Sequence, residues 1–296
     1  MQIKIKQLIT PIISLALLIF LFHDLNITSL EKIFQNSNPI ILILATIILF
    51  VAVPTLSALR WKIILKKLDC DIQFIEALKL YMANLPLAKI SPASSGDLMR
   101  AYYLKEKIKP SMNIGGIIFE RMLDFFVLAN FALFFGILSH NKIAIITGIS
   151  IIIFLITLFV LGSKLKIEKI KNFLYIFKII LKRPKNLGIA IFCTLSLWFV
   201  IIGYIKLIFL ALGVDLVFTQ ILATQPIIIF LSLVPISLSG IGIRESAMVF
   251  FYAGLAPEQT IFMTGLAYSL FGGIILPVLG IPFLYNQFKI KKTYGK

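Results

Sequence analysis

Two short breaks in apolar sequence decide the fold: Ser91-Pro-Ala-Ser-Ser-Gly-Asp-Leu-Met-Arg100 and Pro235-Ile-Ser-Leu-Ser-Gly-Ile-Gly-Ile-Arg244. They interrupt the apolar stretches 74–104 and 221–255 with proline, serine and glycine, and each ends on an arginine. Irregular backbone at membrane depth is tolerated only where it is buried in protein or lines a wet cavity. Each stretch is therefore predicted to be a re-entrant hairpin, in which two half-helices joined by unwound backbone enter the membrane and return.

The rest of the chain has the composition of a membrane protein. Of its 296 residues, 59% are hydrophobic and 14% charged, and the mean hydropathy is +1.00, which excludes a soluble globular domain. Apolar runs of about 20 residues can cross the bilayer as helices, and continuous Ile/Leu/Phe runs favour helices over a barrel. The first run lacks a small-x-small cleavage site, so it is read as an uncleaved span. Six full spans are predicted, at 8–22, 39–59, 117–138, 143–162, 187–212 and 260–285.

The basic residues orient these spans. A net charge of +16 could indicate a nucleic-acid partner, but here the lysines flank apolar runs, so none is expected. With a cytoplasmic N-terminus, the outer loops contain only the basic residues Lys32 and Lys142, whereas Arg60 and many lysines lie at the inner face. Both termini are therefore predicted to be cytoplasmic, in a multi-pass protein of the cell (inner) membrane.

This orientation makes the two hairpins enter from opposite faces. A Pro/Ser/Gly break at corresponding places of two oppositely oriented halves is typical of inverted-repeat transporters. The sequence thus predicts one all-α integral membrane domain over residues 1–296, with halves 1–163 and 186–296. The basic linker 164–185 has apolar residues at helical spacing. It is either an amphipathic helix on the cytoplasmic leaflet or simply a basic connection that follows the orientation rule.

Seven charged side chains inside the apolar sequence are the best functional clue. A charge near the middle of a bilayer costs roughly 2.5–3.5 kcal/mol on insertion scales, so such residues usually face a protein interior or a wet cavity. They form three clusters: Asp97 and Arg100; Glu120, Arg121 and Asp124; Arg244 and Glu245.

The first cluster has two interpretations. Asp97 and Arg100 are three residues apart and can pair on a helix, and the amides after Ser94, Ser95 and Gly96 would open that helix and attract an anion. Arg100 and the serine hydroxyls would then clamp a phosphate or carboxylate. Alternatively, Asp97 is only an N-cap and Arg100 extends to the membrane surface.

The second cluster has one carboxylate more than an isolated ion pair needs. Arg121 can pair with Asp124, and Glu120 lies on the same helix face. The surplus acid could meet Arg100 or Arg244, or carry a coupling proton. Simple placement at the membrane interface is the alternative.

The third cluster is predicted to be the deepest. It follows the candidate ligand contacts Ser237, Ser239, Gly240 and Gly242, where glycines let backbone approach a ligand closely. Arg244 and Glu245 are adjacent, so they are expected to point in different directions and to have different partners. The alternative is a structural pair that locks the hairpin.

Together the motifs Ser-Gly-Asp-x-x-Arg (95–100), Glu-Arg-Met-x-Asp (120–124) and Pro-x-Ser-x-Ser-Gly-x-Gly-x-Arg-Glu (235–245) resemble those of the lysylphosphatidylglycerol synthase transmembrane family. This flippase-like domain also occurs as free-standing proteins of about the length of this chain. In the family the first motif more often reads Gly-Glu, where this chain has Asp97. Because the chain ends soon after its last span, the soluble aminoacyl-transferase domain of the best-studied members is expected to be absent.

The resemblance implies a translocator of an anionic phospholipid or a polyprenyl-phosphate-linked lipid, with these membrane lipids as its partners. A membrane enzyme is not expected, because the serines near Arg100 and Arg244 lack an adjacent His or Lys base. Two cysteines and two poorly placed histidines argue against a metal site, and no cofactor is expected. The alternative function is a non-transporting scaffold for a glycosyltransferase or lipid-modifying enzyme; a homo-oligomer is left open.

Overall fold

The computed structural model describes residues 31–33, 35–164, 168–182, 184–233 and 240–294. The predicted first span, 8–22, lies outside these residues, and so do Ser237 and Ser239. The elements named in the described part are helices, and five are long and apolar enough to cross a membrane. The chain is therefore an all-α, multi-pass membrane protein, as predicted.

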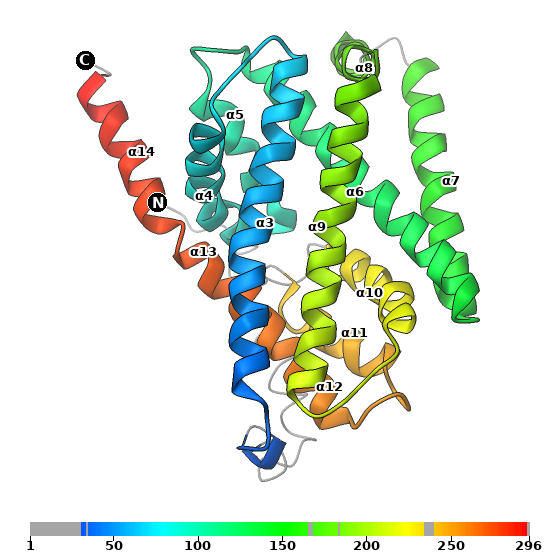
Figure 1. The fold of residues 1–296 in the computed structure, drawn as a ribbon. Coiled ribbons are helices and arrows are strands. Elements are labelled where there is room, and N and C mark those ends of the chain that lie inside the picture. Colours follow the sequence, from blue (N-terminus) through cyan, green and yellow to red (C-terminus); the bar gives the residue numbers. More distant parts are fainter. Residues whose placement is uncertain (1–30, 34, 165–167, 183, 234–239, 295–296) are drawn as a thin grey trace, which may run out of the picture.

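Four of these spans are continuous helices (Figure 1): α3 (Pro39–Lys67), α6 (Pro110–Leu138), α7 (Lys142–Lys164) and α9 (Pro184–Ala211). The fifth combines α12 (Glu258–Tyr268), the π-helix η3 (Ser269–Ile275), α13 (Leu276–Val278) and α14 (Ile281–Tyr294). α6 is the most buried span and α7 the least, which places α7 at the periphery. Each span covers its predicted run, but α3 and α6 extend about two turns further toward one end of the bundle.

The first hairpin consists of α4 (Phe74–Ile90), the 3₁₀ helix η1 (Pro92–Leu98) and α5 (Met99–Tyr103). The break is thus a 3₁₀ turn and not the unwound backbone expected from its composition. Its backbone packs so closely that a Cβ on Gly96 would lie 2.2 Å from the carbonyl oxygen of Leu87. Only glycine fits there without a shift of the hairpin.

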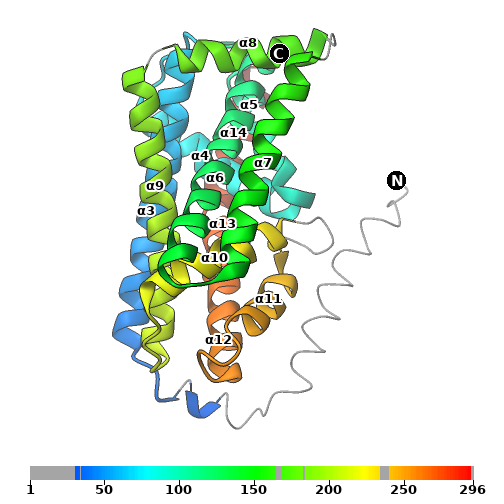
Figure 2. The same ribbon diagram turned by 90° about the vertical axis from the view of Figure 1, so that its right-hand side faces the viewer.

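The second hairpin, α10 (Phe218–Ser232) and α11 (Ile243–Phe251), enters from the opposite end of the bundle (Figure 1). In the first half α3, the first hairpin and α6, and in the second half α9, the second hairpin and the last span, follow one another in opposite orientations, while α7 has no described counterpart in the second half. The antiparallel helices α3 and α9 pack side by side (Figure 1) along one edge of the bundle (Figure 2), and the amide of Asn38 donates to the carbonyl of Ala211 at 2.7 Å where they meet. This arrangement is the predicted inverted repeat.

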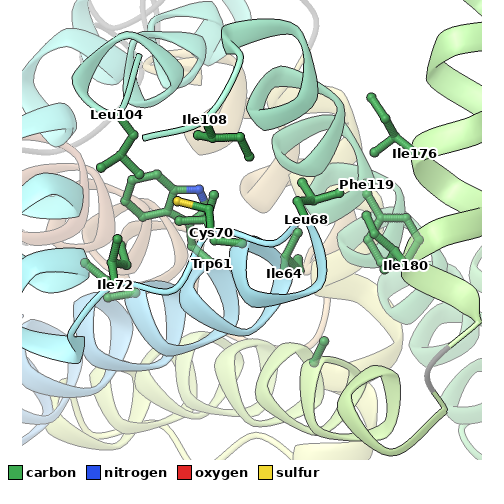
Figure 3. Close-up of a cluster of buried hydrophobic side chains, with 14 of the residues drawn as sticks. Trp61, Ile64, Leu68, Cys70, Ile72, Leu104, Ile108, Phe119, Ile176 and Ile180 are labelled. Carbon is green, nitrogen blue, oxygen red and sulfur yellow. The ribbon is translucent and has the colours of Figure 1, made fainter. Parts of the chain in front are cut away.

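The linker between the halves forms α8 (Glu168–Leu181), which lies across one end of the bundle (Figure 2). Its Ile176, Phe177 and Ile180 are buried in a core cluster together with Trp61 and Phe119 (Figure 3). The predicted helix exists, but at these positions its apolar face packs on α3 and α6 and not on a leaflet. The placement of Lys67 also differs from the prediction. The sequence placed this lysine at the inner membrane face, but it is buried and donates to the carbonyl of Ile180.

The close approach of the last span to the first hairpin gives a stability prediction. A Cβ on Gly280 would lie 2.3 Å from the carbonyl oxygen of Met82, so Gly280→Ala forces the two elements apart. We expect a loss of about 1–3 kcal/mol, measured as a lower thermal unfolding midpoint in detergent. The control is Gly203→Ala in α9, where a Cβ would meet nothing within 4 Å; an equal loss there would contradict the prediction.

Candidate functional site

The first site is a network of buried charges centred on α6. Glu120 and Asp124 are almost fully buried, at 1% and 3% exposure, whereas the side chain of Arg121 is 44% exposed. These three residues face α3, the first hairpin and α9. They pair with side chains from several elements, so the interfacial alternative does not describe the two buried carboxylates.

Arg60 on α3 is the partner that sequence reasoning missed. Its Nη1 donates to Asp124 Oδ1 at 2.6 Å and to Thr194 Oγ1 at 3.2 Å, and its Nε lies 3.9 Å from Glu120 Oε1. Arg60 was assigned to the inner membrane face because the apolar run ends at Leu59. The helix instead continues to Lys67, which keeps Arg60 inside the bundle with 4% exposure.

α9 contributes a second contact to the same carboxylate. The indole Nε1 of Trp198 donates to Asp124 Oδ1 at 3.0 Å. Asp124 thus accepts hydrogen bonds from α3 and α9, in addition to its contact with Arg121 at 3.5 Å on its own helix. A carboxylate that accepts from donors on several helices holds these helices in one arrangement.

Arg100 belongs to the same network. Its Nη2 donates to Glu120 Oε2 at 2.8 Å, which is one of the possibilities that the sequence left open for the surplus acid of the second cluster. The guanidinium carbon lies 5.1 Å from the ring centre of Trp61 and 5.6 Å from that of Tyr81, so cation–π contacts add to the pair. With 1% exposure, Arg100 lies in the interior and does not extend to the membrane surface.

Asp97 is bound by other partners than expected. It forms an ion pair with Arg121 and accepts from Asn84 Nδ2 at 2.9 Å, so the predicted pair with Arg100 is wrong. Asp97 belongs to η1 and Arg100 to α5, and each pairs with a different residue of α6, Arg121 and Glu120 respectively. Acids and bases consequently alternate through the network in the order Asp97, Arg121, Asp124, Arg60, Glu120, Arg100.

The other predicted members of the first break are less engaged. Ser95 is exposed, and the side chain of Ser94 lies outside the described residues. The amide of Gly96 donates to the hydroxyl of Ser91 at 2.6 Å, so this N–H is not available to an anion as predicted. Gly96 therefore shapes the hairpin.

The second site lies on the opposite hairpin, around Ser269 of η3. Arg244 Nη1 donates to Ser269 Oγ at 2.8 Å, and this hydroxyl donates to Glu245 Oε1. The guanidinium of Arg244 also lies over the ring of Tyr268, 4.5 Å from its centre. Arg244 and Glu245 therefore share Ser269, in contrast to the separate partners expected from adjacent positions.

The glycines of the second break act on backbone geometry. Gly240 and Gly242 have φ of +80° and +86°, a region that side chains disfavour. The amide of Gly242 donates to Glu245 Oε2 at 2.6 Å, so Glu245 caps α11 and also contacts Ser269. Together these contacts fix the second hairpin against the last span.

The two sites together contain all seven of the charged residues proposed from the sequence, whereas Ser95 and Gly96 of the first break lie outside them. In the described part of the chain, no three His, Cys, Asp or Glu side chains gather in a way that could hold a metal ion. Paired guanidinium groups near hairpin tips are suited to recognising an anionic group such as phosphate.

Opposed hairpins and buried ion pairs inside apolar helices define a multi-pass helical membrane protein. Residues 7–280 match the family described as the lysylphosphatidylglycerol synthase TM region, and the chain belongs to this family.

Its relatives are described only as membrane proteins. A UPF0104 membrane protein of Archaeoglobus fulgidus is 25% identical over 84% of this chain and 86% of its own length. One from Methanocaldococcus jannaschii is 33% identical over 45% of this chain and 41% of its own length. A second UPF0104 membrane protein from that organism is 30% identical over 54% of this chain and 75% of its own length. No solved structure is significantly similar to this chain.

Removing Arg60 tests the network. In Arg60→Gln, Asp124 loses its buried countercharge, so we expect a loss of about 3–5 kcal/mol of stability, seen as a lower unfolding midpoint in detergent. Adding Asp124→Asn should restore part of this loss, because the unpaired carboxylate is then removed. The control is Lys66→Gln on the same helix, whose pair with Asp71 is exposed and should change stability by less than about 1 kcal/mol.

Removing the hydroxyl of Ser269 tests the second site. Ser269→Ala leaves buried polar atoms of Arg244 and Glu245 without this partner, so we expect a loss of about 1–3 kcal/mol in the same unfolding measurement. Ser163→Ala is the control, because that hydroxyl is exposed and bonds only within its own helix in the described contacts. Equal midpoints for the two variants would show that Ser269 is not a structural bridge.

Proposed function

We propose that the protein is a transporter, and not an enzyme, that moves an anionic phospholipid or a polyprenyl-phosphate-linked lipid between the leaflets. The observation that carries the proposal is the pair of hairpins that enter from opposite ends and bring their tips to one cleft, lined by Lys89 of α4 and Ile241 of the second break. Hairpins from inverted halves that meet near mid-depth are the usual substrate site of such transporters.

The charges around the hairpins support an anionic substrate. Arg121 is the accessible guanidinium of the first network, and Arg244 lies directly after the second break. Their carboxylate partners balance these charges when the site is empty, and a phosphate can replace a carboxylate with little change in geometry. The hydrocarbon tails would remain in the bilayer, so only the headgroup needs a polar path.

The distribution of basic residues supports a cytoplasmic orientation for one end of the bundle. α8 and the end of α14 lie at the same end of the bundle (Figure 1), and basic residues such as Lys66 and Lys107 flank the spans there. We therefore propose that this end faces the cytoplasm in the cell membrane. A rocking motion of one half against the other would open the site to each leaflet in turn.

A reconstituted transport assay tests the proposal. Purified protein in liposomes should speed the movement of headgroup-labelled phosphatidylglycerol from the inner leaflet, measured by quenching of the label from outside. Arg244→Ala should slow the movement about ten-fold, the effect of losing one charge-assisted contact. Arg244→Lys should keep more of the rate than Arg244→Ala, because it retains the charge.

Two controls separate transport from leakage and misfolding. Lys142→Ala changes an exposed residue at the start of α7 and should leave the rate unchanged. Each variant must retain its unfolding midpoint in detergent to be compared. Equal quenching in liposomes with and without the wild-type protein, for both lipid classes, would exclude the proposed transport.

A further inference from the structure

Lys89 differs from the arginines described above in having no acidic partner among the residues that the structure describes. It lies in the last turn of α4, at the tip of the first hairpin, and is partly buried. In the described part of the chain no carboxylate forms an ion pair with it. Its side chain lines a cleft together with Ile241 of the second break and residues of the last span, so Lys89 lies where the first hairpin meets the second half.

The charge balance around the hairpins makes this lysine exceptional. Arg60, Arg100 and Arg121 are matched by Asp97, Glu120 and Asp124, and Arg244 by Glu245 through Ser269. Among the described side chains of the two networks and the cleft, the charge of Lys89 remains uncompensated. A cation without a countercharge beside apolar walls favours a bound anion.

The cleft beside Lys89 has a volume of about 290 Å³. Apart from the lysine its lining is mostly aliphatic, with contributions from the first hairpin, the second break and the last span. Several lining residues are also largely exposed on the outside of the bundle, including Ile90 at 69% and Val278 at 52%. In a membrane this cleft therefore opens toward lipid hydrocarbon.

A single cation beside aliphatic walls matches one class of ligand. A small soluble anion would find one charged contact and otherwise apolar surface, whereas a lipid phosphate brings a charge and hydrocarbon together. The nearby residues are Pro86, Lys89, Ile90, Ile241, Ile274 and Pro277.

We propose that this cleft binds one anionic lipid through its phosphate, which contacts the ammonium of Lys89 while the first carbons of the lipid chain lie against the aliphatic wall. This inference rests on the proposed function and assigns its headgroup contact to Lys89. It replaces the phosphate clamp that the sequence placed at Arg100, because this side chain is buried against Glu120 and two aromatic rings.

Native mass spectrometry of the purified full chain in detergent measures the binding. The probes are phosphatidylglycerol, a polyprenyl phosphate, and diacylglycerol, which lacks phosphate. Lys89→Gln should bind the phosphate lipids about ten-fold more weakly and diacylglycerol equally, whereas Lys89→Arg should bind like the wild type. If Lys89→Gln weakened the binding of only one of the two phosphate lipids, that result would identify the lipid class that the cleft binds and would also support the site.

Two further variants control for position and folding. Lys79→Gln lies on the same helix and is exposed, so it should bind like the wild type. A Cβ at Gly273 would meet nothing within 4 Å, so Gly273→Leu can fill the cleft while keeping Lys89 and should also weaken phosphate-lipid binding. The proposed site would be overturned if Lys89→Gln and Gly273→Leu both bound the phosphate lipids like the wild type. It would also be overturned if Lys89→Gln lost its binding of diacylglycerol to the same extent as its binding of the phosphate lipids.

The transport assay distinguishes this inference from the function on which it rests. If wild-type protein moves lipid and Lys89→Gln moves and binds it equally well, the headgroup contact lies elsewhere and only the inference fails. If wild-type protein binds phosphate lipid through Lys89 but moves none, the site stands and the proposed transport fails.

Discussion

The ion pair between Arg60 and Asp124 is the contact on which the first half depends. It joins α3 to α6, and the same carboxylate accepts the indole of Trp198 on α9. Through Glu120 and Arg121 the pair extends to the first hairpin. Desolvated charges of this kind tolerate neither removal of one partner nor a shift of one helix alone, so the half behaves as one unit.

The second half has a smaller and different junction. A single hydroxyl, that of Ser269, bridges Arg244 and Glu245, and it lies where the last span becomes a π-helix. π-Helical turns are frequent at functional sites. The halves are thus alike in topology but not in chemistry: one is held by a network of salt bridges, the other by a serine between two charges. Lys89 lies at their junction.

Sequence reasoning recovered the architecture because hydropathy and Pro/Ser/Gly breaks report directly on membrane depth. It also included Arg100 among the possible partners of the surplus acid Glu120, because a buried acid favours a nearby cation, but it left Arg244 and a coupling proton open. It missed Arg60, because a charge at the end of an apolar run looks like an interfacial residue until tertiary contacts extend the helix. Ser269 carries no signal in sequence, and Asp97 is engaged by Arg121 of α6 and Asn84 of α4, tertiary contacts that spacing within one segment does not report.

The separation of Arg60 and Asp124 by 64 residues has a consequence for biogenesis. When α3 leaves the ribosome, its arginine has no acid to neutralise it, and hydrocarbon penalises an unpaired guanidinium. The C-terminal part of α3 must therefore remain in contact with polar groups, at the translocon or the lipid headgroups, until α6 has been synthesised. Insertion of α3 is then completed only after α6 has been synthesised. The first hairpin, which lies between α3 and α6 in the sequence, packs between them in the same step.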